Sequence, residues 1–272
     1  MLRSLWTGAS GMIAQQENVD TIANNLANVN TTGYKKEKTE FKSLLYQSIQ
    51  KHSTDSNGNL KPVGVQVGLG VRSSAITSQF KQGAFLESSG AYDFAIEGDG
   101  MFRVQMSDGT IGYTRNGNFK LSVGTGGMTL CSSEGYPVLD VDGNPIVFSD
   151  PDFDANKLSF DQYGNIMYKD DRNNYQPMGI RISLAQFNNP AGLTKVGDSL
   201  FIQSAASGEP RIETVDGGIK VSKIVKGYLE GSNVQAVDEM VDLIVAQRAY
   251  EMNSKIITAS DEMLQQANGL RR

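Results

Sequence analysis

The sequence predicts an α+β protein with three parts. Long N- and C-terminal helices form a coiled-coil-like stem, and an all-β domain is inserted between them. Apolar residues recur at helical spacing at both ends of the 272-residue chain, and short alternating segments with turn signals fill the middle. We therefore predict a helical arm with an extended segment over residues 1–62 and the β domain over 63–228. A second helical arm over 229–272 is expected to pack with the first.

The first helix is expected over residues 2–29. Its apolar residues step by three and four, with only Gln16 breaking the series: Leu2, Leu5, Ala9, Met12, Val19, Ala23 and Leu26. Trp6, Ile13 and Ile22 widen this stripe, so the helix has an apolar face broad enough for more than one neighbour.

The last helix is expected from Val234 to about Leu270, with Ser232 or Asn233 as its N-cap. Its stripe also alternates steps of four and three and is interrupted only by Gln266: Val245, Ala249, Met252, Ile256, Ala259, Met263 and Leu270. At 1.5 Å per residue this helix is roughly 50 Å long, more than a compact domain can cover from within. The stripe therefore needs a partner helix.

Two arrangements satisfy these stripes. They can pack against each other in an antiparallel hairpin that completes one monomer, or they can pack against other subunits. We favour the second arrangement, in which both stripes are subunit-packing surfaces. The free subunit is then expected to keep a folded β domain and largely unfolded arms.

Between the arms the pattern changes to strands. A short helix is expected first, carrying Phe41, Leu44, Leu45 and Ile49, and then one strand over residues 63–71, where valine or leucine alternates with glycine or glutamine. Asp108-Gly109 lies between alternating segments and predicts a hairpin. Further strands are expected at Phe94–Ile96, Phe102–Met106, Ile111–Tyr113, Met178–Leu184, Leu200–Ile202 and Ile219–Val221.

Composition removes most enzyme and metal chemistry. Cys131 is the only cysteine and His52 the only histidine. A zinc site of the usual type therefore cannot be assembled, a Cys-His pair is implausible, and a Ser-His-Asp triad would have to use His52. The net charge of −5 argues against nucleic acid as a partner, and Lys35, Lys36 and Lys38 are interpreted as a solvated basic cluster. No apolar segment is long enough to span a bilayer or to form a signal peptide. We predict no catalytic residue, no metal site and no cofactor.

Acidic residues around position 150 partly match a calcium loop. Asp150, Asp152, Asp154, Asn156 and Asp161 take its ligand positions, but Ala155 stands where the loop requires glycine. A solvated acidic turn is the preferred interpretation. The neighbouring Asp170 and Asp171, like Asp99, say nothing in sequence about the separation that a glycosidase requires.

Three motifs resemble those of the bacterial flagellar rod and hook family. They are Ile22-Ala23-Asn24-Asn25-Leu26-Ala27-Asn28-Val29-Asn30-Thr31-Thr32-Gly33-Tyr34-Lys35, then Gly98-Asp99-Gly100-Met101-Phe102-Arg103-Val104 with Tyr113-Thr114-Arg115-Asn116-Gly117-Asn118-Phe119, and a C-terminal motif containing Gln247-Arg248-Ala249-Tyr250-Glu251 and Asn253-Ser254-Lys255. The family positions carried over are Asn24, Asn25, Leu26, Asn28, Gly33, Gln247, Arg248, Tyr250 and Asn253. Length, a single β domain and the segment over residues 46–66 are most similar to the distal rod branch of the family.

The resemblance implies a structural subunit and no enzyme. Members of this family pack their terminal helices as concentric coiled coils around an export channel, which gives a self-assembling helical tube that serves as drive shaft and export conduit. Implied partners are further copies, other rod proteins, the hook protein, the surrounding rings and the export apparatus. The implied location is the periplasmic rod of the basal body, reached without a cleaved signal peptide. A proximal rod or hook-like axial protein, a polysaccharide-acting enzyme and a coiled-coil adhesin are the alternatives.

Overall fold

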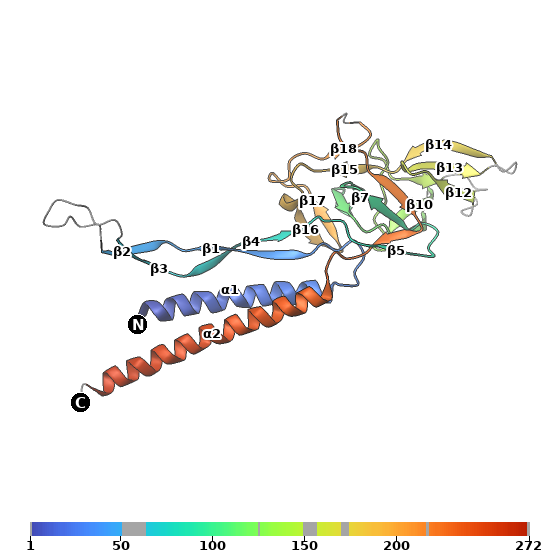
Figure 1. Cartoon of the computed structure of the whole chain (residues 1–272). Helices are drawn as coiled ribbons and strands as arrows, with labels where there is room; N and C mark the ends of the chain where they lie inside the picture. The colour runs from blue at the N-terminus through green and yellow to red at the C-terminus, as the bar shows by residue number, and fades with distance from the viewer. Residues whose placement is uncertain are drawn as a thin grey trace. The chain divides into compact units, whose positions relative to one another are not determined.

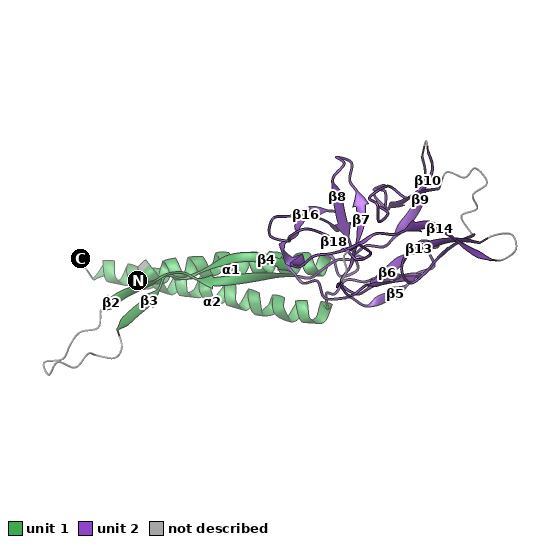
Figure 2. Cartoon of the chain, turned by 90° about the horizontal axis from the view of Figure 1, so that it is seen from above, with its two compact units in different colours: residues 1–27, 37–77, 235–272 green, residues 28–36, 78–234 purple. Residues whose placement is uncertain are grey.

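The computed structural model describes residues 2–50, 64–124, 126–148, 157–169, 174–215 and 218–270. Contacts divide the chain into two compact units, shown in different colours in Figure 2. Unit 1 contains Met1–Ala27, Glu37–Thr77 and Gln235–Arg272, and unit 2 contains Asn28–Lys36 and Ser78–Val234. His52, Asp170, Asp171 and the first four ligand positions of the predicted acidic turn lie outside the described residues.

Two long helices dominate unit 1, as predicted. Helix α1 spans Leu2–Ala27 and helix α2 spans Ala236–Gly269. They lie side by side and antiparallel, so that the start of α1 is beside the end of α2 (Figure 1).

The expected N-cap residues of the second helix, Ser232 or Asn233, were wrong. Gln235 is the N-cap residue of α2 and makes no side-chain capping bond. The Asn233 side chain instead accepts a bond from the Lys36 amide and donates to the Gln79 carbonyl, both within unit 2.

The short helix expected around Phe41–Ile49 is wrong. This part of unit 1 forms strands β1 (Glu37–Ser43) and β2 (Tyr46–Gln50), which pair with β4 (Val71–Ser78) and β3 (Val65–Gly68) respectively. Distant backbone partners override local helical spacing here: Leu44 N–H donates to the Gly70 carbonyl at 2.9 Å.

The single strand expected over residues 63–71 was also wrong. The chain breaks between β3 and β4 at Gly70, whose φ of +116° is a conformation that favours glycine. A Cβ at this position would collide with the Ser10 side chain of α1. Gly70, which the sequence placed on one face of a strand, therefore forms a turn that passes close to α1.

Unit 2 is β-rich. Its largest sheet has six strands in the order β16-β17-β8-β7-β15-β18. These strands are β16 (Thr194–Gly197), β17 (Leu200–Ile202), β8 (Ile111–Thr114), β7 (Met101–Gln105), β15 (Leu184–Gln186) and β18 (Arg211–Ile212). The predicted Asp108-Gly109 hairpin joins β7 to β8, with Gly109 at φ +83°. The predicted strand at Leu200–Ile202 is likewise confirmed as β17.

Smaller antiparallel sheets complete unit 2. Within the described part of the unit, two of them have three strands and two have two strands. The members are β9 (Phe119–Gly124), β10 (Gly127–Ser132) and β11 (Val147–Phe148); β12 (Leu158–Phe160), β13 (Asn165–Lys169) and β14 (Tyr175–Arg181); β6 (Phe94–Glu97) with β19 (Lys223–Lys226); and β5 (Phe85–Glu87) with β20 (Tyr228–Glu230). One short 3₁₀ helix, Pro190–Gly192, interrupts the described strands.

Two strand predictions in unit 2 need correction. Met178–Leu184 is split between β14 and β15, because residues 182–183 leave the small sheet to reach the large one. Ile219–Val221 is not a strand, and pairing with β6 begins only at Lys223. In both places apolar residues continue to alternate in the sequence although the chain changes the strand with which it pairs. The local sequence does not encode that change.

The hydrophobic core of unit 2 lies between these sheets. It gathers Phe94, Ile96, Phe102, Val104 and other side chains that are almost fully buried. The Phe102 and Phe119 rings pack edge to face with their centroids 5.0 Å apart. Such ring contacts stabilise the fold beyond the contribution of the buried apolar area alone.

Phe102→Ala should destabilise unit 2 strongly. Removing a fully buried ring leaves a cavity and costs about 3–5 kcal/mol in the free energy of unfolding. Urea unfolding of the full chain, followed by near-ultraviolet circular dichroism, measures this loss. Val123→Ala is the control: this side chain is 81% exposed, and the change should cost at most about 0.5 kcal/mol. Equal effects of the two changes would show that Phe102 is not part of the cooperative core.

Candidate assembly site

Small and polar side chains hold α1 against α2. Ser4 Oγ lies 3.1 Å from Ser260 Oγ near the chain ends, and Asn25 Nδ2 donates to Glu239 Oε2 at 3.1 Å at the opposite end of the helix pair. Between them, a Cβ on Gly8 would lie 3.1 Å from Ile257 and a Cβ on Gly11 would lie 2.8 Å from the Asn253 amide. We call these residues the hairpin seam: Ser4, Gly8, Gly11, Asn25, Glu239, Asn253, Ile257 and Ser260.

The predicted apolar stripes are not the hairpin seam. Val245, Met252, Ile256 and Met263 of α2 are 47–61% exposed, and Leu270 is 88% exposed. In α1, Leu5, Ala9, Met12, Val19 and Leu26 are partly buried beside the seam, and Ala23 is exposed. The antiparallel hairpin therefore forms, yet it leaves apolar surface uncovered on both helices. Whether this surface packs against other subunits stays a prediction.

Asn25 fixes the junction between α1 and β1 within unit 1. Its amide nitrogen donates to the Glu37 carbonyl at 2.8 Å, and its oxygen accepts from the Glu37 amide at 2.8 Å. The same amide reaches Glu239, which is fully buried in the first turn of α2. One asparagine thus joins three elements, and it satisfies both backbone groups of Glu37.

The other predicted motif residues of the helices divide into two groups. Asn253 lies in the hairpin seam, whereas Asn24 and Gln247 are exposed. Arg248 forms an exposed ion pair with Glu251 at 2.8 Å, and Tyr250 is 42% exposed. The exposed motif residues are accessible to other chains, whereas Asn253 packs against α1 within the same chain.

The second polar centre is a buried ion network in unit 2. Glu230 of β20 accepts from Lys35 Nζ at 2.6 Å and from Arg115 Nη1 at 3.3 Å, and all three side chains are at most 1% exposed. Lys35 also donates to the Lys81 carbonyl, and Arg115 Nη2 donates to the Gly98 carbonyl at 2.7 Å. The network joins residues that are about 80 to 195 positions apart in the chain.

Burial acts against the charges of this network. Loss of hydration lowers the pKa of Lys35, and the nearby Arg115 lowers it further, while Glu230 opposes the shift. Burial also lowers the pKa of Arg115, and the carboxylates of Glu230, Asp99 and Glu213 oppose that shift. The single carboxylate of Glu230 is in direct contact with both cations, so its charge is what makes their burial tolerable.

Gly33 brings the N-terminal motif into the same network. Its amide donates to the Glu230 carbonyl at 2.8 Å, and its φ is +71°. A Cβ at this position would lie 2.6 Å from the Asn116 amide nitrogen, so only glycine allows the two backbones to approach. Beside it, Thr32 donates to the Asn116 side chain at 3.0 Å, and Asn28 caps the turn with its side-chain contact to Thr31.

The interpretation of Lys35 as part of a solvated cluster was wrong. Lys38 is exposed, but Lys35 is 2% exposed and bound to Glu230. Glu230 was missed altogether in the sequence. Its partners are distant in the chain, and a lone glutamate carries no local signal. The available hint was that Lys35 and Arg115 each lie within a family motif.

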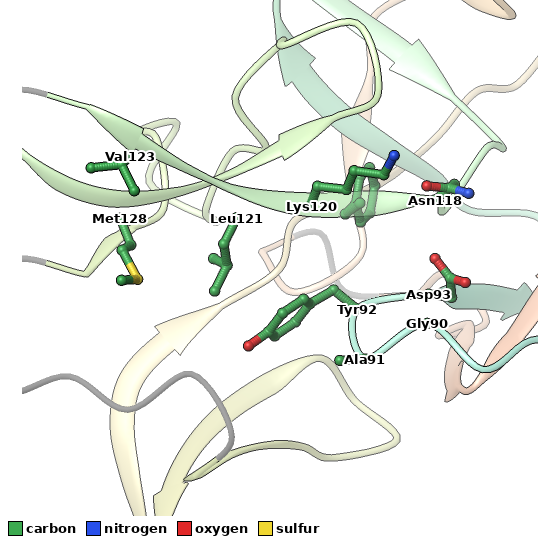
Figure 3. Close-up of a pocket in the computed structure, with 10 residues that line it drawn as sticks. Gly90, Ala91, Tyr92, Asp93, Asn118, Lys120, Leu121, Val123 and Met128 are labelled. Atoms are coloured by element: carbon green, nitrogen blue, oxygen red, sulfur yellow. The ribbon is translucent and has the colours of Figure 1, made fainter.

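A cavity of about 490 Å³ lies on unit 2, and Lys35, Arg115 and Glu230 are not among its described lining residues. Figure 3 shows Tyr92, Leu121 and Met128 at its wall, together with Asp93 and Lys120. The described lining residues contain one carboxylate, Asp93, which accepts a bond from Ser88. A glycosidase needs two opposed carboxylates, so this lining does not support polysaccharide hydrolysis.

Two further searches concern only the described residues. They contain no group of three or more histidine, cysteine, aspartate or glutamate side chains placed to hold a metal ion. None of their helices is both long enough and apolar enough to cross a membrane.

Comparisons with known proteins agree along the whole chain. Residues 5–35 match the family "Flagella basal body rod protein", 95–168 match "Flagellar hook protein FlgE/F/G D1 domain", and 225–270 match "Flagellar basal body rod FlgEFG protein C-terminal". The chain is 44% identical to the flagellar basal-body rod protein FlgG of Borreliella burgdorferi and 40% identical to FlgG of Bacillus subtilis. It is 31% identical to the flagellar hook-basal body complex protein FlhP of Bacillus subtilis. Each comparison covers 100% of both chains.

Glu230→Gln should destabilise unit 2 by about 3–5 kcal/mol. The change keeps the side-chain volume but leaves Lys35 and Arg115 buried beside a neutral group. Urea unfolding of the full chain measures the loss. Glu251→Gln is the matched control, because it removes the same charge from an exposed pair worth at most about 0.5 kcal/mol. An unchanged unfolding midpoint in Glu230→Gln would contradict the role given to the network.

Proposed function

This chain belongs to the FlgG family of flagellar basal-body rod proteins and is a structural subunit of the distal rod. We propose that many copies assemble into a helical tube through their terminal helices. The tube transmits torque, and its bore is the path along which later subunits are exported. Assembly with other rod and hook proteins is implied by the family.

The observation that carries this proposal is that the residues which hold α1 against α2 are different from the residues of the apolar stripes. A largely polar seam holds α1 to α2 in one chain, while most of the α2 stripe is exposed. The α1 stripe is partly buried, and Trp6 and Ile13 beside it are exposed. Exposed Met252, Ile256 and Met263 in regular register would be a liability on a solitary monomer. They are what a subunit needs if every copy is to be covered by its neighbours.

Finer parts of the proposal rest on family membership. We place the subunit in the periplasmic part of the basal body, exported without a cleaved signal peptide. Further partners are the surrounding ring proteins and the export apparatus. Repetition supplies stiffness in such an assembly, because each interface recurs in every subunit and none has to be strong alone.

Ile256→Asp should abolish rod assembly while leaving unit 2 folded. Ile256 lies in the middle of the α2 stripe and is 47% exposed in the single chain, so the change costs little before assembly. In the tube, the carboxylate would be buried without a partner at every copy, at a cost of several kcal/mol. Electron microscopy of basal bodies, with motility as a second readout, measures the effect.

The control for this experiment is Thr258→Asp. It adds the same carboxylate two residues away on an exposed part of α2 outside the stripe. Rods should form with Asp at 258 and be absent with Asp at 256. Normal rods in Ile256→Asp cells would remove the α2 stripe from the assembly interface.

A further inference from the structure

The cavity of about 490 Å³ on unit 2 has no part in the proposed assembly. Its volume falls within the range of about 300–1,000 Å³ that small-molecule sites occupy in proteins. One wall is the loop over residues 90–93, between β5 and β6, and the other wall comes from β9 and β10. In Figure 3 the side chains of Tyr92, Leu121 and Met128 gather at one end, and the Asp93 carboxylate lies at the other. The cavity therefore has an apolar end and a polar end.

Asp93 has an unused acceptor at the polar end. The residue is 6% exposed, and its Oδ2 atom accepts a hydrogen bond from the Ser88 hydroxyl. None of the described groups donates to Oδ1. A Cβ on Gly90 would collide with the carboxylate, so glycine at this position leaves room for it. Because a nearly buried acceptor with free lone pairs is costly, a ligand that donates to Oδ1 gains free energy.

The charges of the lining favour a neutral ligand. The described lining holds one carboxylate, Asp93, and one ammonium group, Lys120, so their effects on a charged ligand of either sign roughly cancel. A cationic ligand would also lose its hydration beside the buried carboxylate, whereas a hydroxyl group loses much less. Asn118 adds an amide that both donates and accepts. Several hydroxyl groups on one neutral molecule can donate to Asp93 and accept from Lys120 and Asn118.

The apolar end narrows the class of ligand further. A polyol without apolar surface would leave Tyr92, Leu121 and Met128 facing water. A pyranose ring carries hydroxyl groups around its rim and apolar C–H groups on its faces. One such ring therefore matches both ends of the cavity.

We propose that this cavity binds a pyranose saccharide, whose hydroxyl groups donate to Asp93 and whose C–H face packs against Tyr92 and Leu121. Hydrolysis does not follow, because a glycosidase needs a second carboxylate that the described lining does not contain. Every described lining residue belongs to unit 2, whereas α1 and α2 belong to unit 1. Saccharide binding is thus a function separate from assembly through the terminal helices.

Saturation-transfer-difference NMR on the full chain tests this site. Cellotriose is the neutral pyranose probe, and free lysine is the probe for an amphipathic cation. The wild-type chain should transfer saturation to cellotriose and not to lysine. Asp93→Asn keeps the side-chain shape and an acceptor for Ser88 but removes the charge, so it should weaken cellotriose binding about tenfold.

Asn118→Ala is the second variant and guards against misfolding of the first. The Asn118 side chain makes no hydrogen bond to a described group, so its removal should leave the thermal unfolding midpoint unchanged and still weaken cellotriose binding. Asn144→Ala is the matched control, because it makes the same change at an exposed asparagine outside the described lining. It should bind cellotriose as the wild type does.

Three results would overturn the proposal and leave the rod function untouched. The first is the absence of saturation transfer to cellotriose from the wild-type chain. The second is transfer to lysine alone, which would indicate a site for cations. The third is equal cellotriose binding by the wild type, Asp93→Asn and Asn118→Ala, which would place the saccharide elsewhere on the chain.

Discussion

The buried contact of Glu230 with Lys35 and Arg115 is the interaction on which unit 2 depends. It draws together the segment after α1, the turn after β8 and the last strand before α2. Two cations buried at 1% exposure are tolerable only beside a carboxylate and well-placed carbonyl groups. The Lys81 and Gly98 carbonyls complete the cations' hydrogen bonds, and the Gly83 amide donates to Glu230. The network therefore gives the unit one arrangement of chain segments that lie far apart in sequence.

Polar contacts have a parallel role in unit 1. The hairpin seam is made largely of glycine, serine, asparagine and glutamate, so α1 and α2 come close without using most of their apolar residues. A hydrophobic seam would tolerate shifts of register and would compete with the stripes for the same partners. Directional bonds at both ends of the helix pair define the register instead. Most of the apolar stripe of α2 therefore stays exposed in the single chain.

The family motifs have a physical explanation in these two places. Asn25 and Asn253 belong to the hairpin seam, and Gly33, Lys35 and Arg115 belong to the ion network or its backbone contacts. These are residues whose function is to position backbone segments within one chain. In our proposal the rod contact uses ordinary apolar residues such as Met252 and Ile256, whose identity matters less than their spacing.

The sequence alone determined the two helices, the β-rich middle and the hairpin at Asp108-Gly109, because spacing and turn chemistry are local properties. It also determined the family, through the motifs at both ends. It misassigned residues 41–50 as helix and Lys35 as solvated, and it gave no indication of Glu230. Only the tertiary structure decided these points, since each depends on a partner distant in the chain. The structure also decided which face of each helix closes the hairpin. Glycine, serine and asparagine give no hydropathy signal, whereas the apolar stripe one residue away gives a strong one.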